Sequence, residues 1–242
     1  MTEIRFGDYA ALTFDCYGTL IDWERGILAA LQPWRQRVRL DVDRETLLVA
    51  FGEIESGLEA AHPSMLYPDL LAEVQRQLGT RFDAPATDAE AEAFGRSVKD
   101  WPAFPDSADA LAYLKRHHKL AILSNVDRAS FAHSAKKLGV TFDLVVTAQD
   151  VGSYKPALAH FNVGLERLAA MGVDRSKVLH VAQSLFHDHV PAKKVGLPTV
   201  WINRRGGKGG EGATPSAEPV TPDLEVPSMA ALVEIHRRQA GG

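Results

Sequence analysis

Residues 12–22 read LTFDCYGTLID, and this stretch decides the fold. The apolar run 10–14 is typical of a buried strand, and it stops abruptly at the carboxylate of Asp15. A turn at residues 18–19 follows, and a second acid stands at Asp22. A lone aspartate at a strand end more often caps the strand than reacts, so the rest of the chain must decide between a cap and a nucleophile.

Four further short apolar runs follow, none with a clean alternation of polar and apolar residues. Such runs are typical of strands in a parallel sheet that is covered on both faces. The predicted strands span residues 11–14, 120–124, 144–148, 178–182 and 198–202. Helical patterns separate them and span residues 107–118, 128–139, 156–172 and 187–196. Strands that alternate with helices predict a doubly wound α/β fold with a parallel sheet.

Residues 23–100 interrupt this alternation. They contain helical patterns, such as 46–61 and 67–79, but no convincing strand. We therefore expect two domains: an α/β core formed by residues 1–22 and 101–242, and an all-helical cap inserted after the first strand.

The overall composition is that of an ordinary globular protein. The chain has 242 residues, 45% of them hydrophobic, and a net charge of −4. This charge does not indicate a basic surface that would bind nucleic acid. No apolar stretch approaches the roughly 20 residues of a membrane helix, and the N-terminus does not read as a secretory signal. The only cysteine, Cys16, cannot form an internal disulfide, so the fold does not depend on an oxidising compartment. From these observations together we expect a cytoplasmic protein that binds neither nucleic acid nor membranes. Residues 206–222 are rich in glycine and proline, which predicts a flexible surface loop.

Polar residues follow the predicted strands at their carboxyl ends, where ligands bind in doubly wound sheets. The candidates are Asp15 and Thr19 after the first strand, Ser124 and Asn125 after the second, Lys155 after the third, and Asp188 after the fourth. Each alone has an ordinary structural explanation, such as capping a helix or facing solvent. Each of four successive predicted strands is followed by such polar residues, and together they indicate a catalytic site.

In these motifs the chain resembles the haloacid dehalogenase-like (HAD) hydrolase superfamily, and the resemblance covers nearly all of it. The four motifs are DCYGTL beginning at Asp15, Ser124 with Asn125, Lys155 with Pro156, and the segment around Asp188. Residues 23–100 stand where members with a cap after the first motif carry it. The resemblance implies a Rossmann-like core with a helical cap. The chemistry is a separate question, because the fold hosts several reactions.

The residue types at the strand ends suit covalent catalysis. The aspartate of the first motif can attack the substrate and form a covalent intermediate. Thr19 and Ser124 can orient it by hydrogen bonds, and the backbone N–H groups of residues 16–18 can hold an anion. Lys155 supplies a fixed positive charge beside the nucleophile and an anionic substrate. Asp188 can anchor that lysine or position a water molecule.

Phosphatases of the superfamily carry a second aspartate two residues after the nucleophile, which protonates the leaving oxygen. Here that position is Tyr17, a poor acid at neutral pH. Their Mg²⁺ is held by the first aspartate and an acid of the fourth motif, where this chain has the neutral Gln183. We therefore expect no metal or other cofactor. If the protein were a phosphatase, Asp15 and Asp188 would be the Mg²⁺ ligands.

Displacement of a halide needs neither feature, because halide leaves without a proton and a monoanionic substrate needs no metal. The DxYGTL signature is similar to that of the type II 2-haloacid dehalogenases. That resemblance implies that Asp15 attacks the carbon bearing the halogen and forms an ester, which water then hydrolyses. The leading interpretation is a hydrolase that converts short 2-haloacids to 2-hydroxy acids, with catalytic residues Asp15, Thr19, Ser124, Lys155 and Asp188.

The same resemblance supplies candidates for binding the substrate or the halide, although it is incomplete. These candidates are Cys16, Tyr17, Asn125, Arg35 and Ser184. Asn125 matches an asparagine that helps to hold the halide. Arg35 and Arg44 both lie in the region of the family's halide-binding arginine, but neither matches in spacing and context together. Phe161 stands where the family has a tyrosine, and the fourth motif keeps its aspartate but not its asparagine.

Two alternatives stay open: a Mg²⁺-dependent phosphatase of a small phosphorylated metabolite, and a non-catalytic protein that binds a small anion or a protein. The expected partner of the enzyme is a small anionic molecule, and the resemblance allows a homodimer. His187 and His189 could be acid–base groups, but helix-start histidines more often face solvent. Asp22 reads as structural and the Cys16 thiol as a buried filler. We expect packing within the cap, rather than pocket lining, for Trp34, Phe51, Met65 and Tyr67.

Overall fold

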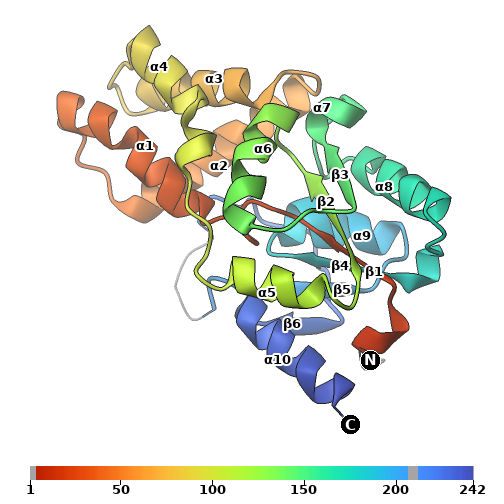
Figure 1. The fold of residues 1–242 in the computed structure, drawn as a ribbon. Helices are drawn as coiled ribbons and strands as arrows, with labels where there is room; N and C mark the ends of the chain where they lie inside the picture. Colours follow the sequence, from red (N-terminus) through yellow and green to blue (C-terminus); the bar gives the residue numbers. More distant parts are fainter. Residues whose placement is uncertain (1–3, 207–211, 242) are drawn as a thin grey trace.

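The computed structural model describes residues 4–206 and 212–241, and its centre is a six-stranded parallel sheet (Figure 1). The strands are β1 (Ala11–Phe14), β2 (Lys119–Ser124), β3 (Leu144–Thr147), β4 (Val178–Ala182), β5 (Thr199–Ile202) and β6 (Leu224–Val226). Their order is β3-β2-β1-β4-β5-β6, and every pairing is parallel. The doubly wound α/β fold that the sequence predicts is therefore confirmed.

The strand order explains how distant residues meet. All five predicted strands are present, β1 and β4 with the predicted bounds. The sixth strand, β6, was not predicted, because three residues at the edge of a sheet carry no periodic signal. β1 lies between β2 and β4, so Asp15, Ser124 and Gln183 reach the same edge of the sheet.

Helices cover both faces of the sheet, because successive side chains of a strand point to opposite faces. One core cluster joins Leu12 and Phe14 of β1 to the helices α5 (Ser107–Leu114), α6 (Arg128–Leu138) and α10 (Met229–Ala240). A second cluster joins Ala11 to α8 (Ala159–Ala170) and α9 (Val190–Lys194).

Between β1 and α5, which packs on the sheet, the chain forms the helices α1 (Trp23–Val38), α2 (Arg44–Ala61), α3 (Tyr67–Arg81) and α4 (Asp88–Gly95), followed by the short 3₁₀ helix η2 (Ser97–Asp100). They gather beside one end of the sheet (Figure 1) and form the helical cap. The Asp22 carboxylate accepts a hydrogen bond from the backbone N–H of Arg25 at 3.2 Å and caps α1, which confirms its structural role. Trp34 and Phe51 are buried in the hydrophobic core, as expected. The boundaries between the two domains stay a prediction.

The described residues 214–222 are partly or fully exposed and lie outside any helix or strand, as the composition of the segment 206–222 predicts, but residues 212–213 just before them are buried. Residues 207–211 lie outside the described residues. Just beyond them, Ala213 is fully buried against α2 at Gly52, where a Cβ atom would lie 2.2 Å from the carbonyl oxygen of Ala213. A glycine in α2 thus leaves room for the backbone of a segment that composition alone assigns to the surface.

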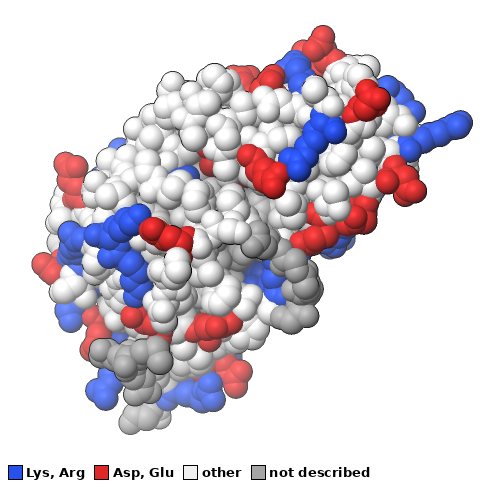
Figure 2. Space-filling view, turned by 180° about the vertical axis from the view of Figure 1, so that it is seen from behind, with Lys and Arg blue, Asp and Glu red and all other residues white. Residues whose placement is uncertain are grey.

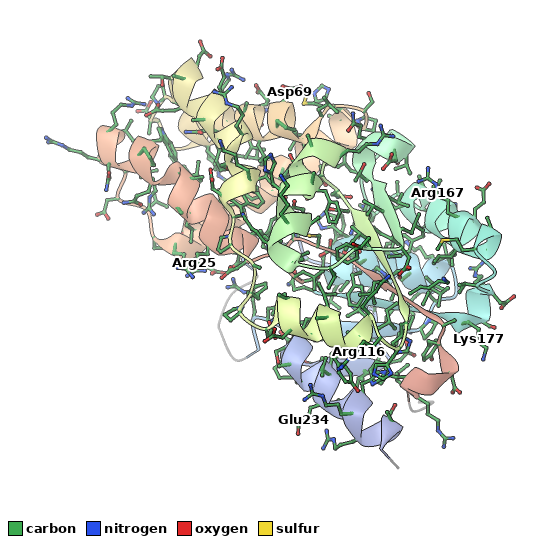
Figure 3. The ribbon with its side chains drawn as sticks, viewed as in Figure 1. Arg25, Asp69, Arg116, Arg167, Lys177 and Glu234 are labelled. Carbon is green, nitrogen blue, oxygen red and sulfur yellow. The ribbon has the colours of Figure 1, made fainter. Side chains whose placement is uncertain are left out.

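Charged residues are spread over the molecular surface, and both signs are mixed on the face shown in Figure 2. The charged side chains labelled in Figure 3, such as Arg116 and Arg167, lie at the periphery of the fold and are exposed. No helix in the described part of the chain combines the length and the apolar character that a membrane span needs.

Candidate active site

The ammonium group of Lys155 lies at the centre of the polar residues that follow the strands. Its Nζ atom donates to Asp15 Oδ1 at 2.9 Å, to Asp188 Oδ1 at 2.7 Å and to the carbonyl oxygen of Leu123 at 2.9 Å. The side chain is only 1% exposed. A lysine ammonium has three N–H donors, so all three are used within the protein.

Asp15, directly after β1, is held from two sides. One carboxylate oxygen accepts from Lys155, and the other accepts from the hydroxyl of Thr19 at 2.7 Å. The Thr19 hydroxyl oxygen in turn accepts from the backbone N–H of Gln183 at 2.9 Å, which ties the end of β1 to the end of β4. The carboxylate orientation is therefore fixed before any ligand binds.

Burial and neighbouring charges shift the pKa values of this network in opposite directions. Burial alone would lower the pKa of Lys155, yet the carboxylates of Asp15 and Asp188 hold it above its ordinary value. Burial opposes ionisation of Asp188 too, but Lys155 and His180 keep its pKa well below the usual range. Burial raises the pKa of Asp15, against the pull of Lys155. A poorly solvated carboxylate beside a permanent cation is suited to act as a nucleophile.

His180 supports Asp188 from within β4. Its Nε2 atom lies 3.1 Å from Asp188 Oδ1, and its Nδ1 atom lies 2.9 Å from the hydroxyl of Thr13. His180 is not among the residues that the motifs predict for the site. The available signal was a polar side chain in the middle of the apolar run 178–182.

The second motif supports the loop that carries the lysine. Asn125 Oδ1 accepts from the backbone N–H of Lys155 at 2.7 Å, and Asn125 Nδ2 donates to the Lys155 carbonyl oxygen at 3.1 Å. Nδ2 also donates to Glu59 at 3.1 Å, so both of its N–H bonds are used. The prediction that Asn125 holds a halide is therefore not supported by this geometry. The hydroxyl of Ser124 is buried, and it has no hydrogen-bond partner among the described residues.

Tyr17 points its hydroxyl group away from Asp15. The hydroxyl lies 2.8 Å from Ser134 Oγ on α6, and the ring meets Trp101 edge-on with 5.6 Å between centroids. Burial raises the pKa of Tyr17 well above its ordinary value. Only the aromatic ring of Tyr17 lines the site, so the residue is neither an acid for a leaving group nor a hydrogen-bond donor to a ligand.

Of the three backbone N–H groups at residues 16–18 that are predicted to hold an anion, one is used within the protein. The backbone N–H of Gly18 donates to the carbonyl oxygen of Ile21 at 2.8 Å, so this part of the turn is closed to an anion. The side chain of Cys16 is fully buried in the hydrophobic core, as expected for a filler. Arg35 does not reach the site, because its guanidinium donates to the carbonyl oxygen of Val42.

A small cavity of about 40 Å³ separates the strand ends from the cap. That space is on the scale of a few water molecules, which suits a short ligand. The cap contributes Trp23, Glu55, Glu59 and Tyr67 to its wall. Tyr67 therefore lines the pocket, contrary to the expectation that it only packs the cap.

Glu55 and Glu59 are the unexpected residues of the site. Glu55 accepts from the hydroxyl of Tyr67 at 2.6 Å, and burial raises the pKa of both glutamates to about 8. A readable signal existed, because both acids interrupt the apolar stripe that runs through Leu48 and Phe51 on α2.

The fourth motif is more buried than the sequence suggests. Asp188 and its two flanking histidines belong to a π-helical turn, η4 (Leu185–His189). His187 and His189 are 8% and 0% exposed, so the expectation that they face solvent is wrong. Burial lowers the pKa of both, that of His189 to about 4. Ser184 caps the turn by accepting from the backbone N–H of His187 at 2.9 Å, and both residues line the cavity.

The donor set at this site does not suit Mg²⁺. Asp188 Oδ1 already accepts from Lys155 and His180, and Gln183 offers only an amide oxygen, which accepts from Thr214. Both oxygens of Asp15 are engaged as well. Within residues 4–206 and 212–241, no three acidic, histidine or cysteine side chains converge on a position for a metal ion.

Comparisons with known proteins agree with this fold. The family model for haloacid dehalogenase-like hydrolases matches residues 9–187. The (S)-2-haloacid dehalogenase of Pseudomonas sp. (strain YL) is 30% identical over 95% of each chain. The (S)-2-haloacid dehalogenase H-109 of Pseudomonas putida is 25% identical over 86% of this chain and 92% of its own. The solved structure of L-2-haloacid dehalogenase from Xanthobacter autotrophicus covers 95% of this chain and 98% of its own, with a TM-score of 0.75 at 21% identity. The chain therefore belongs to the haloacid dehalogenase-like hydrolase family.

Proposed function

We propose that the protein displaces halide from short 2-haloacids through an ester on Asp15 and releases 2-hydroxy acids. The observation that carries this proposal is the Asp15 carboxylate, oriented by Lys155 and Thr19 toward a small cavity, with no acid at position 17. The similarity to (S)-2-haloacid dehalogenases supports the same choice.

In the first step, a carboxylate oxygen of Asp15 bonds to C2 of the substrate, and the halide leaves with the electron pair of the carbon–halogen bond. Lys155 keeps the carboxylate ionised and aimed, and the halide needs no proton. In the second step, water attacks the carbonyl carbon of the ester. The 2-hydroxy acid leaves with the oxygen that belonged to Asp15, and one proton is released.

We assign Asp188 to the second step. Its Oδ1 atom anchors Lys155, whereas its buried Oδ2 atom has no hydrogen-bond partner among the described residues. That oxygen can accept a hydrogen bond from the attacking water and orient it. The low pKa of Asp188 makes it a positioning group rather than a strong base. No step requires a metal.

The test is halide release from 2-chloropropionate in the presence of a chelator, followed by one turnover in ¹⁸O-water. We expect an unlabelled hydroxyl oxygen in the product and one ¹⁸O atom in the peptide that contains Asp15. If no short 2-haloacid releases halide, the proposal fails. Chelator-sensitive hydrolysis of p-nitrophenyl phosphate would instead identify a phosphatase.

Tyr17→Phe is expected to leave the kcat/KM for halide release within about threefold of the wild type. The lost hydroxyl binds Ser134 and not the reacting atoms, so the change should lower the free energy of unfolding by about 1 kcal/mol. Steady-state kinetics and urea unfolding measure both effects. A loss of 10²-fold or more, the usual scale for removing a general acid, would show that the tyrosine donates a proton.

A further inference from the structure

We propose that His180, held in place by Thr13, is the positioning residue that keeps Asp188 aimed at the attacking water in the second step. The inference rests on the proposed function and deepens it, because it assigns to β4 a residue that governs hydrolysis of the Asp15 ester. His180 is not among the described residues that line the cavity, so it acts through the carboxylate of Asp188.

The two partners of the His180 ring determine where its protons lie. Nε2 lies 3.1 Å from Asp188 Oδ1, and an ionised carboxylate can only accept hydrogen bonds, so Nε2 carries a proton. Nδ1 lies 2.9 Å from the Thr13 hydroxyl, which can donate to a neutral ring or accept from a charged one. In both charge states of the ring, therefore, His180 donates a hydrogen bond to Asp188.

The sheet fixes the position of this donor. Thr13 and His180 are register partners on β1 and β4, so both side chains project from the same face of the sheet. Phe161 of α8 packs on that face, with 5.0 Å between the centroids of its ring and the His180 ring and 70° between their planes. Because His180 is fully buried, bulk water cannot supply the hydrogen bond in its place.

Two donors at one oxygen determine how the Asp188 carboxylate is turned. Oδ1 accepts from Lys155 at 2.7 Å and from His180 at 3.1 Å, and the two donors come from different parts of the chain. The terminal torsion of an aspartate is soft, so a single donor would leave the carboxylate free to turn about its Cβ–Cγ bond. With both donors in place, Oδ2, which has no partner among the described residues, keeps one orientation for the attacking water.

The first step of the reaction does not depend on His180. Lys155 and Thr19 orient Asp15, and neither hydrogen bond involves the histidine. When Asp15 becomes an ester it loses its negative charge, so of the two carboxylates bound to Lys155 only that of Asp188 is then charged. The ammonium group is drawn toward Asp188 at this stage, and His180 holds the carboxylate against that shift.

The first experiment compares the wild type with His180→Phe on 2-chloropropionate. The phenyl ring fills the same space but donates no hydrogen bond, so the ester should form normally and hydrolyse slowly. We expect kcat to fall roughly 10²-fold, the scale of a misplaced reacting group. KM should fall with it, so that kcat/KM stays within about threefold of the wild type. Mass spectrometry of quenched protein should show the ester accumulating on the peptide that contains Asp15, after a burst of halide that matches the amount of protein.

Two milder variants separate hydrogen bonding from packing. His180→Gln keeps an N–H donor close to the position of Nε2 and should restore most of kcat, whereas a role in packing alone would favour phenylalanine over glutamine. Thr13→Val removes the hydroxyl that holds the ring and should cause a smaller fall in kcat, again without a change in kcat/KM. Thr199→Val is the matched control and should follow the wild type. Thr199 is the register partner of His180 on β5, and its buried hydroxyl has no hydrogen-bond partner among the described residues.

A second measurement does not depend on turnover. In the ¹⁵N NMR spectrum of histidine-labelled protein, the His180 signals, assigned by their absence from the His180→Gln spectrum, should report a protonated Nε2. A ring protonated on Nδ1 alone would overturn the inference whatever the reaction is. If the wild type releases halide but His180→Phe lowers kcat/KM as much as kcat and accumulates no ester, the inference is wrong and the proposed function stands. If the wild type releases halide from no short 2-haloacid, the proposed function is wrong and the inference fails with it.

Discussion

Asp15→Asn is expected to lower kcat for halide release by roughly 10⁴-fold to 10⁶-fold, the scale seen when a catalytic nucleophile is removed. The amide keeps the shape of the carboxylate and can still contact Lys155 and Thr19. It loses the negative charge that attacks carbon, so no ester forms. The folded structure should persist, because Lys155 retains Asp188 as its ionic partner.

The measurement combines initial rates of halide release with mass spectrometry of protein quenched during turnover. The wild type should carry an adduct on the peptide that contains Asp15, and the variant should carry none. Asp22→Asn is the matched control, because Asp22 caps α1 and asparagine caps equally well. It should retain wild-type kinetics. An Asp15→Asn protein with more than a tenth of the wild-type rate would place the nucleophile elsewhere.

The core of the site could be predicted because the topology gathers strand ends. Asp15, Lys155 and Asp188 are separated by up to 173 positions in the sequence, which is the difference between 188 and 15. They meet because the carboxyl ends of parallel strands lie at one edge of the sheet. Each apolar run has a length and a β-branched content that specify a strand without reference to the rest of the chain.

The cap side of the site could not be predicted in the same way. Which face of α2 meets the strand ends depends on how the cap packs on the core, and periodicity specifies only that one face is buried. Glu55 and Glu59 are therefore absent from the predicted site residues, although they stand beside apolar positions. Arg35 was expected in the pocket from resemblance alone. Here α1 directs its guanidinium to the carbonyl group of Val42.

Short and irregular elements were also beyond sequence patterns. The segment 187–196 predicts one regular helix, but the structure has the π-helical turn η4 followed by the short helix α9. That turn buries His187 and His189, which a regular helix start would have left in solvent. The hydrogen bond between His180 and Asp188 likewise depends on the register of β4 with η4 and not on a local motif.

Lys155→Met is expected to abolish measurable turnover and to lower the free energy of unfolding at pH 7 by about 3–5 kcal/mol. The methionine fills most of the volume but leaves Asp15 and Asp188 buried without their cation. Two buried carboxylates in contact raise each other's pKa. Either one of them takes up a proton, or both stay ionised and their repulsion destabilises the folded state. In either case Asp15 is no longer an oriented, ionised nucleophile.

The pH dependence of stability distinguishes this explanation from a simple packing defect. In the wild type, Lys155 depresses the folded-state pKa of Asp188, which contributes stability above the unfolded pKa that is lost as pH falls. In the variant, raised carboxyl pKa values contribute stability at low pH that is lost as pH rises. The second effect makes the deficit shrink from pH 7 toward pH 4, and the first adds to it only below the unfolded aspartate pKa of about 4, whereas a packing defect would leave it constant.

Denaturant unfolding at several pH values measures this deficit, and Lys177→Met, at the exposed periphery labelled in Figure 3, is the matched control. Lys155→Met combined with Asp188→Asn should recover part of the stability at pH 7, because it removes one of the two uncompensated carboxylates. It should recover no activity, since Asp15 still lacks the ammonium group that orients it. Recovery of both would mean that Lys155 acts only by offsetting the charge of Asp188. Recovery of neither would mean that the ammonium group supports the fold through the carbonyl of Leu123, its third hydrogen-bond partner.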